Sequence, residues 1–187
     1  MTAAAHPAPS PGATPPAAET GPRAIRVLKV VVNAGVGESG DPRTKAVKVL
    51  EMITHQKPVS TRSRSTNRDF GIREGQEIGA KVTLRGPAAR EFLDRALDAR
   101  DRQLDPASID KVGNFSFGLA DYTDIAGQKY DPQIGIRGMD VCVVLGRAGQ
   151  RIRDRKIQTH ALPKRQRISK EEARRFLAEQ LKVVFLE

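Results

Sequence analysis

The order of strand-like and helix-like segments is the feature that most constrains the fold of this chain. Residues 25–33 are rich in β-branched residues in a nearly continuous apolar run, which indicates a central strand buried on much of both faces. Residues 78–84 alternate apolar and polar side chains, so one face of this strand lies in the core and the other is polar. A short strand framed by glycines is predicted within residues 113–118, and residues 139–145 form the last predicted strand.

Three helices are predicted between and after these strands. Asp41 supplies the N-cap of a helix that ends near His55, and a second helix opens at the Gly-Pro pair of residues 86–87. Ser169 and Glu172 have the spacing of a capping box, which predicts the start of a final helix.

The basic segment from Lys57 is predicted to begin as a further strand, which leads into a long loop. With it, the segments run in the order strand, helix, strand, strand, helix, strand. This order resembles the split βαβ arrangement, an antiparallel sheet with helices packed on one face. The predicted class is therefore α+β, with extended basic loops and one sheet face left for a partner. Residues 1–22 hold six prolines and many alanines, which predicts a disordered tail, and residues 23–187 are predicted to be a single domain.

Basic residues are concentrated in two segments. Residues 57–73 hold five Lys or Arg and one acid, a net charge of +4, and residues 147–167 hold eight and one, a net charge of +7. The formal net charge of the whole chain is +10, so the remaining residues sum to −1. Such localised positive charge is typical of a nucleic-acid-binding protein. Because few acids are available for pairing, we expect these segments to meet phosphates.

The titratable residues form no catalytic or metal-binding pattern. His6, His55 and His160 lack the spacing of a ligand set or a triad, so neither a metal nor a cofactor is predicted. The lone Cys142 lies in an apolar run, where we expect a small buried hydrophobic residue. No apolar run approaches the roughly 20 residues that a membrane span needs, and the N-terminus lacks the pattern of a signal peptide. The sequence therefore favours neither an enzyme nor a membrane protein.

One motif points in another direction. Gly35, Gly37 and Gly40 have the G-x-G-x-x-G spacing of a dinucleotide-binding loop between a strand and a helix. That fingerprint also needs a second parallel strand that ends in an acid about 20 residues further on, where this chain has Lys57 and a basic polar segment. A dinucleotide-dependent oxidoreductase is therefore the weaker hypothesis. The loop itself either brings its backbone close to a phosphate or serves only as a tight turn.

Six short pieces of sequence, which keep the family's order, resemble the family of ribosomal protein five of the large subunit, in its archaeal form. The pieces are Val32-Asn33-Ala34-Gly35-Val36-Gly37-Glu38, Gln56-Lys57-Pro58, Phe70-Gly71-Ile72-Arg73, Lys81-Val82-Thr83-Leu84-Arg85-Gly86, Gly113-Asn114-Phe115-Ser116-Phe117-Gly118, and Tyr130-Asp131-Pro132 with Gly138-Met139-Asp140. The resemblance covers residues 25–187. It implies a non-catalytic constituent of the cytoplasmic ribosome that binds 5S ribosomal RNA in the central protuberance.

The resemblance also implies which residues contact RNA. Asn33, Gln56, Phe70 and Thr83 match the family positions that contact 5S ribosomal RNA. Amide and hydroxyl groups can read base edges or the 2′-hydroxyl, while Phe70 either stacks on a base or packs in the core or within its own loop. The same surface is expected to include Gly35, Gly37, Lys57 and Arg85.

The family's long loop between its second and third strands reaches the elbow of the P-site transfer RNA, which assigns that contact to Arg64, Arg68 and Arg73. The second basic segment matches the family in charge only, and its predicted RNA-binding residues are Arg151, Arg153, Arg155, Lys156, Lys164, Arg165 and Arg167. The implied partners are 5S and 23S ribosomal RNA, P-site transfer RNA, other central protuberance proteins and a protein of the small-subunit head. A free-standing RNA chaperone stays the main alternative, because the same basic segments would serve it equally well.

Overall fold

The chain is built around one five-stranded antiparallel sheet, seen in the computed structural model, which describes residues 21, 23–37 and 40–186. The strand order is β2-β3-β1-β6-β5. A second, two-stranded sheet pairs β4 with β7 in parallel. The strands are β1 (Arg26–Gly35), β2 (Val59–Arg62), β3 (Glu77–Leu84), β4 (Gln103–Leu104), β5 (Phe115–Leu119), β6 (Met139–Gly146) and β7 (Val184–Phe185).

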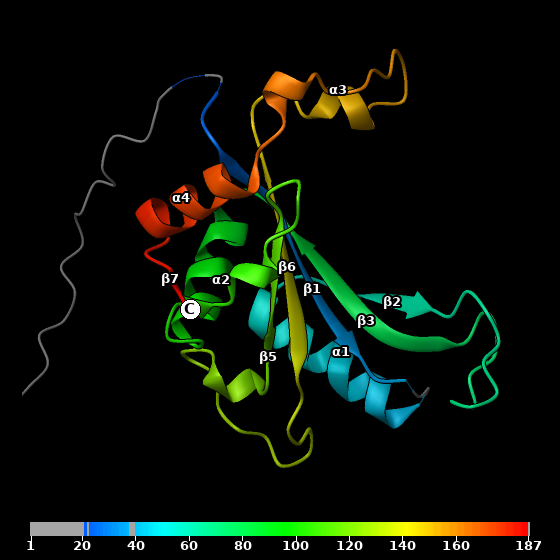
Figure 1. Ribbon diagram of the computed structural model, residues 1–187. Coiled ribbons are helices and arrows are strands. Elements are labelled where there is room, and N and C mark those ends of the chain that lie inside the picture. Colours follow the sequence, from blue (N-terminus) through cyan, green and yellow to red (C-terminus); the bar gives the residue numbers. More distant parts are fainter. Residues whose placement is uncertain (1–20, 22, 38–39, 187) are drawn as a thin grey trace, which may run out of the picture.

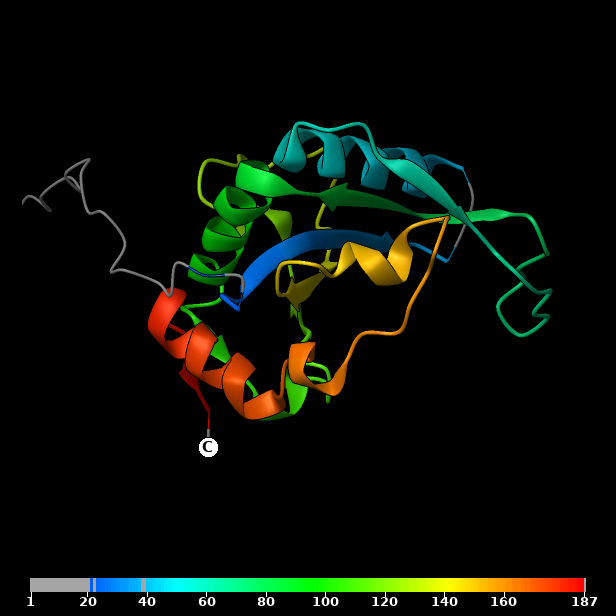
Figure 2. The same ribbon diagram turned by 90° about the horizontal axis from the view of Figure 1, so that it is seen from above.

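Two helices cover one face of the large sheet (Figures 1 and 2). They are α1 (Asp41–Thr54) and α2 (Gly86–Asp98), each with an apolar stripe at helical spacing that is buried against the strands. The remaining helical segments are α3 (Arg151–Asp154), α4 (Lys170–Gln180) and the 3-10 turns η1 (Pro106–Ser108), η2 (Tyr122–Asp124) and η3 (Lys164–Gln166).

The core lies between these helices and every second residue of the strands. Val30 and Val32 of β1, Val82 of β3 and Val141 and Val143 of β6 are all buried. Because successive side chains of a strand point to opposite faces, the residues between them form the other face of the sheet. The sheet therefore has one apolar, helix-covered face and one face of different composition.

The connections confirm the predicted α+β class and the split βαβ arrangement. α1 links β1 to β2, and β3 lies between these two strands in the sheet. The chain from β3 through α2 later reaches β6, and β1 lies between those two strands. The capping box that begins α4 is also confirmed, since the side chain of Ser169 accepts from the backbone N–H of Glu172 and the reciprocal bond is present.

This topology excludes the dinucleotide-binding fold suggested by the glycine motif. Every neighbouring pair in the five-stranded sheet is antiparallel, and β1 is not adjacent to β2, the strand that follows α1. A dinucleotide site needs the crevice of an open parallel sheet. The oxidoreductase hypothesis is therefore wrong.

Three local predictions were wrong. Asp41 is the first residue of α1, and the N-cap is Gly40, so the Asp41 side chain caps nothing. Strand β1 is buried on one face only, although its apolar run predicted burial on much of both. Residues 139–145 are not the last strand, because the two-residue β7 follows α4 and is too short to leave a periodic pattern. The predicted tail falls, apart from residue 21, outside the described residues.

Candidate nucleic-acid interface

The face of the sheet opposite α1 and α2 carries polar side chains mixed with small apolar ones. We call it the open sheet face, because its central residues Lys81, Asp140 and Cys142 are exposed. Strand alternation and register assign its members. They are Lys29, Val31 and Asn33 of β1, Val59 and Thr61 of β2, Lys81 and Thr83 of β3, Ser116 of β5, and Asp140, Cys142 and Val144 of β6.

Two of the predicted RNA-contacting residues meet on this face. Asn33 lies in register between Lys81 on β3 and Asp140 on β6. Thr83 lies on β3 two residues beyond Lys81 and opposite Val31, so it is a diagonal neighbour of Asn33. Both side chains are half-buried and reach solvent. An amide, a hydroxyl and the Lys81 ammonium are thus placed side by side, a set that can donate to and accept from a base edge or a ribose.

A second group of predicted residues lies at one end of the sheet. Val59 of β2 pairs with Lys81, so Gln56 and Lys57, which precede β2, lie beside the end of β3 that leads into Arg85. The side chains of Gln56, Lys57 and Arg85 are all exposed. They extend the open sheet face beyond Thr83 and add two cations to it.

The glycine loop lies at the other end of β1, and its backbone is already occupied. The N–H groups of Val36 and Gly37 both donate to the carbonyl of Ile78, at 3.0 and 2.9 Å. Gly37 has a φ of 77°, a backbone conformation that favours glycine. The negative charge of Asp41, in the first turn of α1, would repel an anion bound at this end of the helix. These features favour the tight-turn interpretation over a phosphate cradle, while Glu38 of the predicted motif lies outside the described residues. RNA contacts by Gly35 and Gly37 stay predictions.

The β2–β3 loop (residues 63–76) extends beyond the edge of the sheet (Figures 1 and 2). Its own hydrogen bonds shape it: Asn67 and Ile72 exchange backbone bonds of 2.8 and 2.9 Å, and Ser63 donates to the carbonyl of Gln76 at 2.8 Å. Phe70 lies in the turn between Asn67 and Ile72 and is 74% exposed. The interpretation that Phe70 packs in the core or within its loop is therefore wrong, and its ring is available for stacking.

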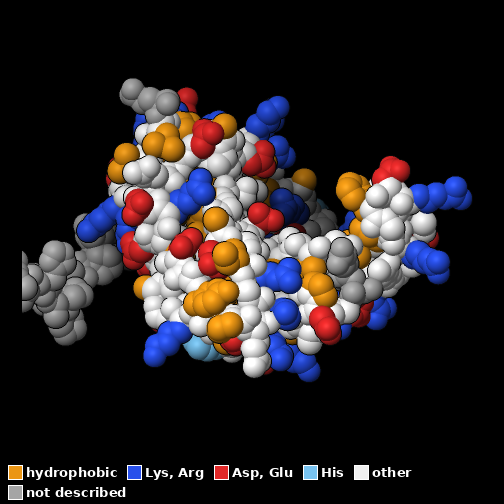
Figure 3. All heavy atoms as spheres, turned by 90° about the horizontal axis from the view of Figure 1, so that it is seen from below, with side chains coloured by type: hydrophobic (Ala, Val, Ile, Leu, Met, Phe, Trp, Pro, Cys, Tyr) orange, Lys and Arg blue, Asp and Glu red, His pale blue; other side chains and the backbone are white. Residues whose placement is uncertain are grey.

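The same loop displays the three arginines assigned to transfer RNA. Arg64, Arg68 and Arg73 are exposed, and none forms an ion pair with a described residue. Lys and Arg side chains stand out from the lobe at the right of Figure 3, which this loop forms. Arg62, at the base of the loop, differs because it lies 3.7 Å from the carboxylate of Glu77.

The basic insert (residues 147–167) rises above the end of β6 (Figure 1). Its predicted RNA-binding residues are exposed, apart from Arg155, which is half-buried and donates to the carbonyl of Gln158 at 2.8 Å. Arg147 has a different role, because it donates to the Arg165 carbonyl at 3.0 Å and to the Glu172 carboxylate at 2.9 Å. It fastens the two ends of the insert to α4.

The carboxylate of Glu172 joins the insert to the cap of α4. It accepts from the backbone N–H of Ser169 at 3.0 Å and from Arg147. These donors hold the pKa of Glu172 below its ordinary value, with the Ser169 hydrogen bond as the largest cause and Arg147 adding to it. Glu172 is thus ionised at neutral pH and supports the position of the insert.

Sequence reasoning misplaced Cys142 and proposed no RNA contact for two members of the open sheet face. Cys142 is exposed rather than buried, because it faces away from the core between Val141 and Val143. Partial burial, and secondarily Asp140, raises the pKa of its thiol. Lys81 and Asp140 were part of the quoted sequence pieces but were not proposed as RNA contacts, although the period of two around Lys81 marks it as part of the polar face.

No group of three His, Cys, Asp or Glu gathers within the described residues to hold a metal ion. None of their helices is long and apolar enough to cross a membrane. An uncovered polar sheet face with two projecting basic segments instead defines a nucleic-acid-binding α+β protein.

The particular family follows from comparison with known proteins. Residues 23–73 match the family model described as ribosomal protein L5, and residues 77–185 match the model that describes the C-terminus of the same ribosomal family. The large ribosomal subunit protein uL5 of Picrophilus torridus is 49% identical over 166 residues, which cover 88% of this chain and 94% of that protein. Its counterpart from Thermoplasma volcanium is 53% identical over 160 residues, which cover 85% and 94%, and that of Methanococcus maripaludis C6 is 50% identical over 151 residues, which cover 79% and 83%. The chain therefore belongs to the ribosomal protein uL5 family.

This family membership confirms three sequence predictions. The chain is a ribosomal protein of archaeal type, and the family is structural rather than enzymatic. A protein of this family belongs to the cytoplasmic ribosome. Binding RNA is the general function of such proteins, which agrees with the charge pattern.

Proposed function

We propose that this protein is the constituent of the large ribosomal subunit that binds 5S ribosomal RNA in the central protuberance. The observation that carries the proposal is the open sheet face, where Asn33 and Thr83 are diagonal neighbours and Lys81 lies opposite Asn33 on the strand of Thr83. Gln56, Lys57 and Arg85 continue this surface at one end of the sheet. Its amides and hydroxyl supply base and ribose contacts, and its cations supply phosphate contacts.

The two projecting segments would then reach other partners. Arg64, Arg68 and Arg73 are exposed on a loop that extends beyond the sheet, which suits a contact with the elbow of P-site transfer RNA. The basic insert would bind 23S ribosomal RNA through phosphates. A protein of the small-subunit head and other central protuberance proteins complete the proposed set of partners.

A selective binding measurement tests the main proposal. The protein's own 5S RNA is compared with a transfer RNA and an unrelated hairpin, at about 0.3 M salt where weak phosphate contacts are screened. We expect tight retention of 5S RNA only. Asn33→Ala and Thr83→Ala should weaken that binding, whereas Ser116→Ala, on the edge strand β5 of the same face, should leave it nearly unchanged.

The RNA chaperone is the competing function, and the measurement separates the two. A chaperone would bind all three RNAs with similar affinity and would lose them together as salt rises. It would also wash off large subunits in a high-salt gradient. Either result would replace the ribosomal assignment of the site with a general RNA-associating one.

A further inference from the structure

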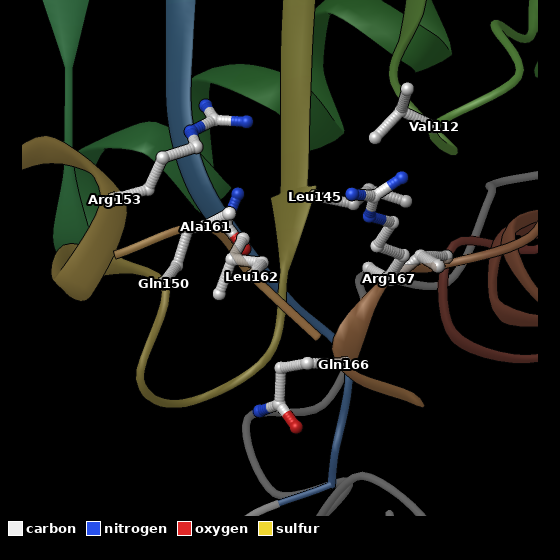
Figure 4. A pocket seen from close by; sticks show the side chains of 9 residues that line it. Val112, Leu145, Gln150, Arg153, Ala161, Leu162, Gln166 and Arg167 are labelled. Carbon is white, nitrogen blue, oxygen red and sulfur yellow. The ribbon is translucent and has the colours of Figure 1, made fainter. Parts of the chain in front are cut away.

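A pocket of about 320 Å³ lies between the basic insert, the end of β6 and the segment that leads into α4 (Figure 4). Its apolar lining comes from Val112, Leu145, Ala161, Leu162 and Ile168. Leu145 and Ile168 are buried and belong to the core, whereas Val112 is 44% exposed. The pocket thus has a firm apolar floor and an apolar wall that is open to solvent.

The rim of the pocket is basic and polar. Arg153 of α3 and Arg167 belong to different ends of the insert, and their side chains are drawn on either side of the end of β6 (Figure 4). The guanidinium group of Arg153 lies 3.3 Å from the carboxylate of the neighbouring Asp154. Arg167 forms no ion pair with a described residue. Gln150 and Gln166 also line the pocket, and no acid does so.

Hydrogen bonds hold these walls in place before any ligand arrives. The side-chain amide of Gln166 donates to the carbonyl of Ala148 at 2.6 Å, which joins the two ends of the insert. This bond uses the amide nitrogen of Gln166 and not its oxygen. Arg147 adds its bonds to Arg165 and Glu172. A pocket formed in advance loses less conformational entropy on binding.

We propose that this pocket takes one unpaired nucleotide that is extruded from an RNA helix. A flat base fits between apolar walls, the Gln150 and Gln166 amides can meet its edge, and the Arg153 and Arg167 guanidinium groups can meet the adjoining phosphates. The volume lies at the lower end of the roughly 300–1,000 Å³ of small-molecule sites, which suits a single nucleotide. A paired and stacked base cannot enter, so the site distinguishes a bulged RNA from a regular duplex.

This proposal rests on the proposed RNA-binding function but concerns a separate surface. Leu145 points to the helix-covered side of β6, whereas Asp140, Cys142 and Val144 belong to the open sheet face. A nucleotide in the pocket would therefore be additional to those read by Asn33 and Thr83. Two arginines and no acid in the pocket lining favour an occupant that is joined to phosphates.

A pair of short RNA duplexes tests the proposal with the full-length protein. One is fully paired, and the other contains one extra unpaired 2-aminopurine nucleotide whose fluorescence rises when it leaves the stack. Affinities are measured by fluorescence anisotropy at about 0.15 M salt. We expect the bulged duplex to bind about tenfold more tightly, a difference within the range of one base held by stacking contacts, and its fluorescence to rise on binding.

Matched variants locate the effect. Ala161→Phe fills the pocket from an exposed position, and His160→Phe places the same ring next to it on a residue that does not line the pocket. Ala161→Phe should abolish the preference for the bulge without weakening binding of the paired duplex, and His160→Phe should retain it. Arg167→Gln should reduce the preference more than Lys156→Gln, which removes the same charge from an exposed site outside the pocket.

Two outcomes would overturn the proposal. Equal affinity of the wild type for both duplexes, with 5S RNA still bound selectively, would remove the nucleotide pocket and leave the proposed function standing. An unchanged bulge preference in Ala161→Phe would place the extruded base outside the pocket and remove the assignment. Failure of the wild type to bind any RNA would count against the proposed function itself.

Discussion

Replacing Glu172 with Gln should measure how strongly the basic insert is fastened to the rest of the fold. A glutamine at this position can still complete the capping box with Ser169, so the substitution removes mainly the charge that faces Arg147. The Arg147 side chain is 12% exposed and the Glu172 side chain 42% exposed. The pair is therefore intermediate between a surface ion pair, worth about 0.2–1 kcal/mol, and a buried pair, where losing one partner costs about 3–5 kcal/mol.

Because the exposure of this ion pair is intermediate, we expect Glu172→Gln to lower the free energy of unfolding by about 1–1.5 kcal/mol at pH 7. For a domain of this size, that corresponds to a fall in the melting temperature of roughly 2–6 °C. Glu171→Gln is the matched control, because Glu171 lies in the same first turn of α4 but forms no described ion pair. Glu171→Gln should lower the free energy of unfolding by only about 0.5 kcal/mol, the value of a charge at a helix N-terminus.

The dependence of this effect on pH gives a second check. Because the pKa of Glu172 in the folded protein lies below the ordinary value of 4.5, its ionisation stabilises the fold at higher pH. That contribution is lost as the pH falls below 4.5 through the folded pKa. Urea unfolding measures this at neutral pH and in the acidic range. The difference in the free energy of unfolding between wild type and Glu172→Gln should shrink as the pH falls. Equal losses for Glu171→Gln and Glu172→Gln, or a difference that does not change with pH, would refute the reasoning.

Three further results are expected. If roughly six phosphates are neutralised, the logarithm of the RNA-binding constant should fall with the logarithm of salt concentration at a slope of about −4 to −5, and a slope near zero would contradict it. Gly79→Ala should lower the free energy of unfolding by about 1–3 kcal/mol, because its new Cβ would lie 2.8 Å from the Ala34 carbonyl oxygen and 2.9 Å from the Thr61 hydroxyl. Gly118→Ala, whose nearest neighbour would be at 3.8 Å, is the control in chemical denaturation. The exposed Cys142 should react slowly with a thiol reagent at pH 7, because partial burial raises the pKa of its thiol. Bound 5S RNA should slow this labelling further, and a labelling rate that RNA does not change would place the RNA elsewhere.

The sequence was sufficient to predict the fold because its patterns agree with the order of the elements. The alternation in residues 78–84 correctly separates the buried and polar faces of β3. No such alternation exists in β1 and β6, where Val31, Cys142 and Val144 share the open sheet face with polar residues. Continuous apolar runs usually indicate burial on both faces, which is why the burial of Cys142 was predicted wrongly.

The candidate site was predictable where it depends on composition and local spacing. Exposed cations in the β2–β3 loop and the insert follow directly from the charge pattern. The anchoring role of Arg147 does not, because its partner Glu172 is 25 residues away and the contact depends on the path of the insert. The pocket beneath the insert was missed for the same reason, since Val112 and Ile168 approach each other only through tertiary packing.

The composition of the open sheet face suggests how selectivity and affinity are divided between surfaces. Antiparallel sheets with one solvated face usually expose polar side chains there, but this face also presents Val31 and Val144. Within the strands its charged residues, among those described, are Lys29, Lys81 and Asp140, so the net charge there is small, and Lys57 and Arg85 add cations only at one end. Such a surface suits sugars and bases better than phosphates, whereas the β2–β3 loop and the insert carry most of the positive charge. Salt should therefore weaken the contacts of the two projections first, and the discrimination of 5S RNA by the sheet should persist after most of the phosphate-driven affinity is gone.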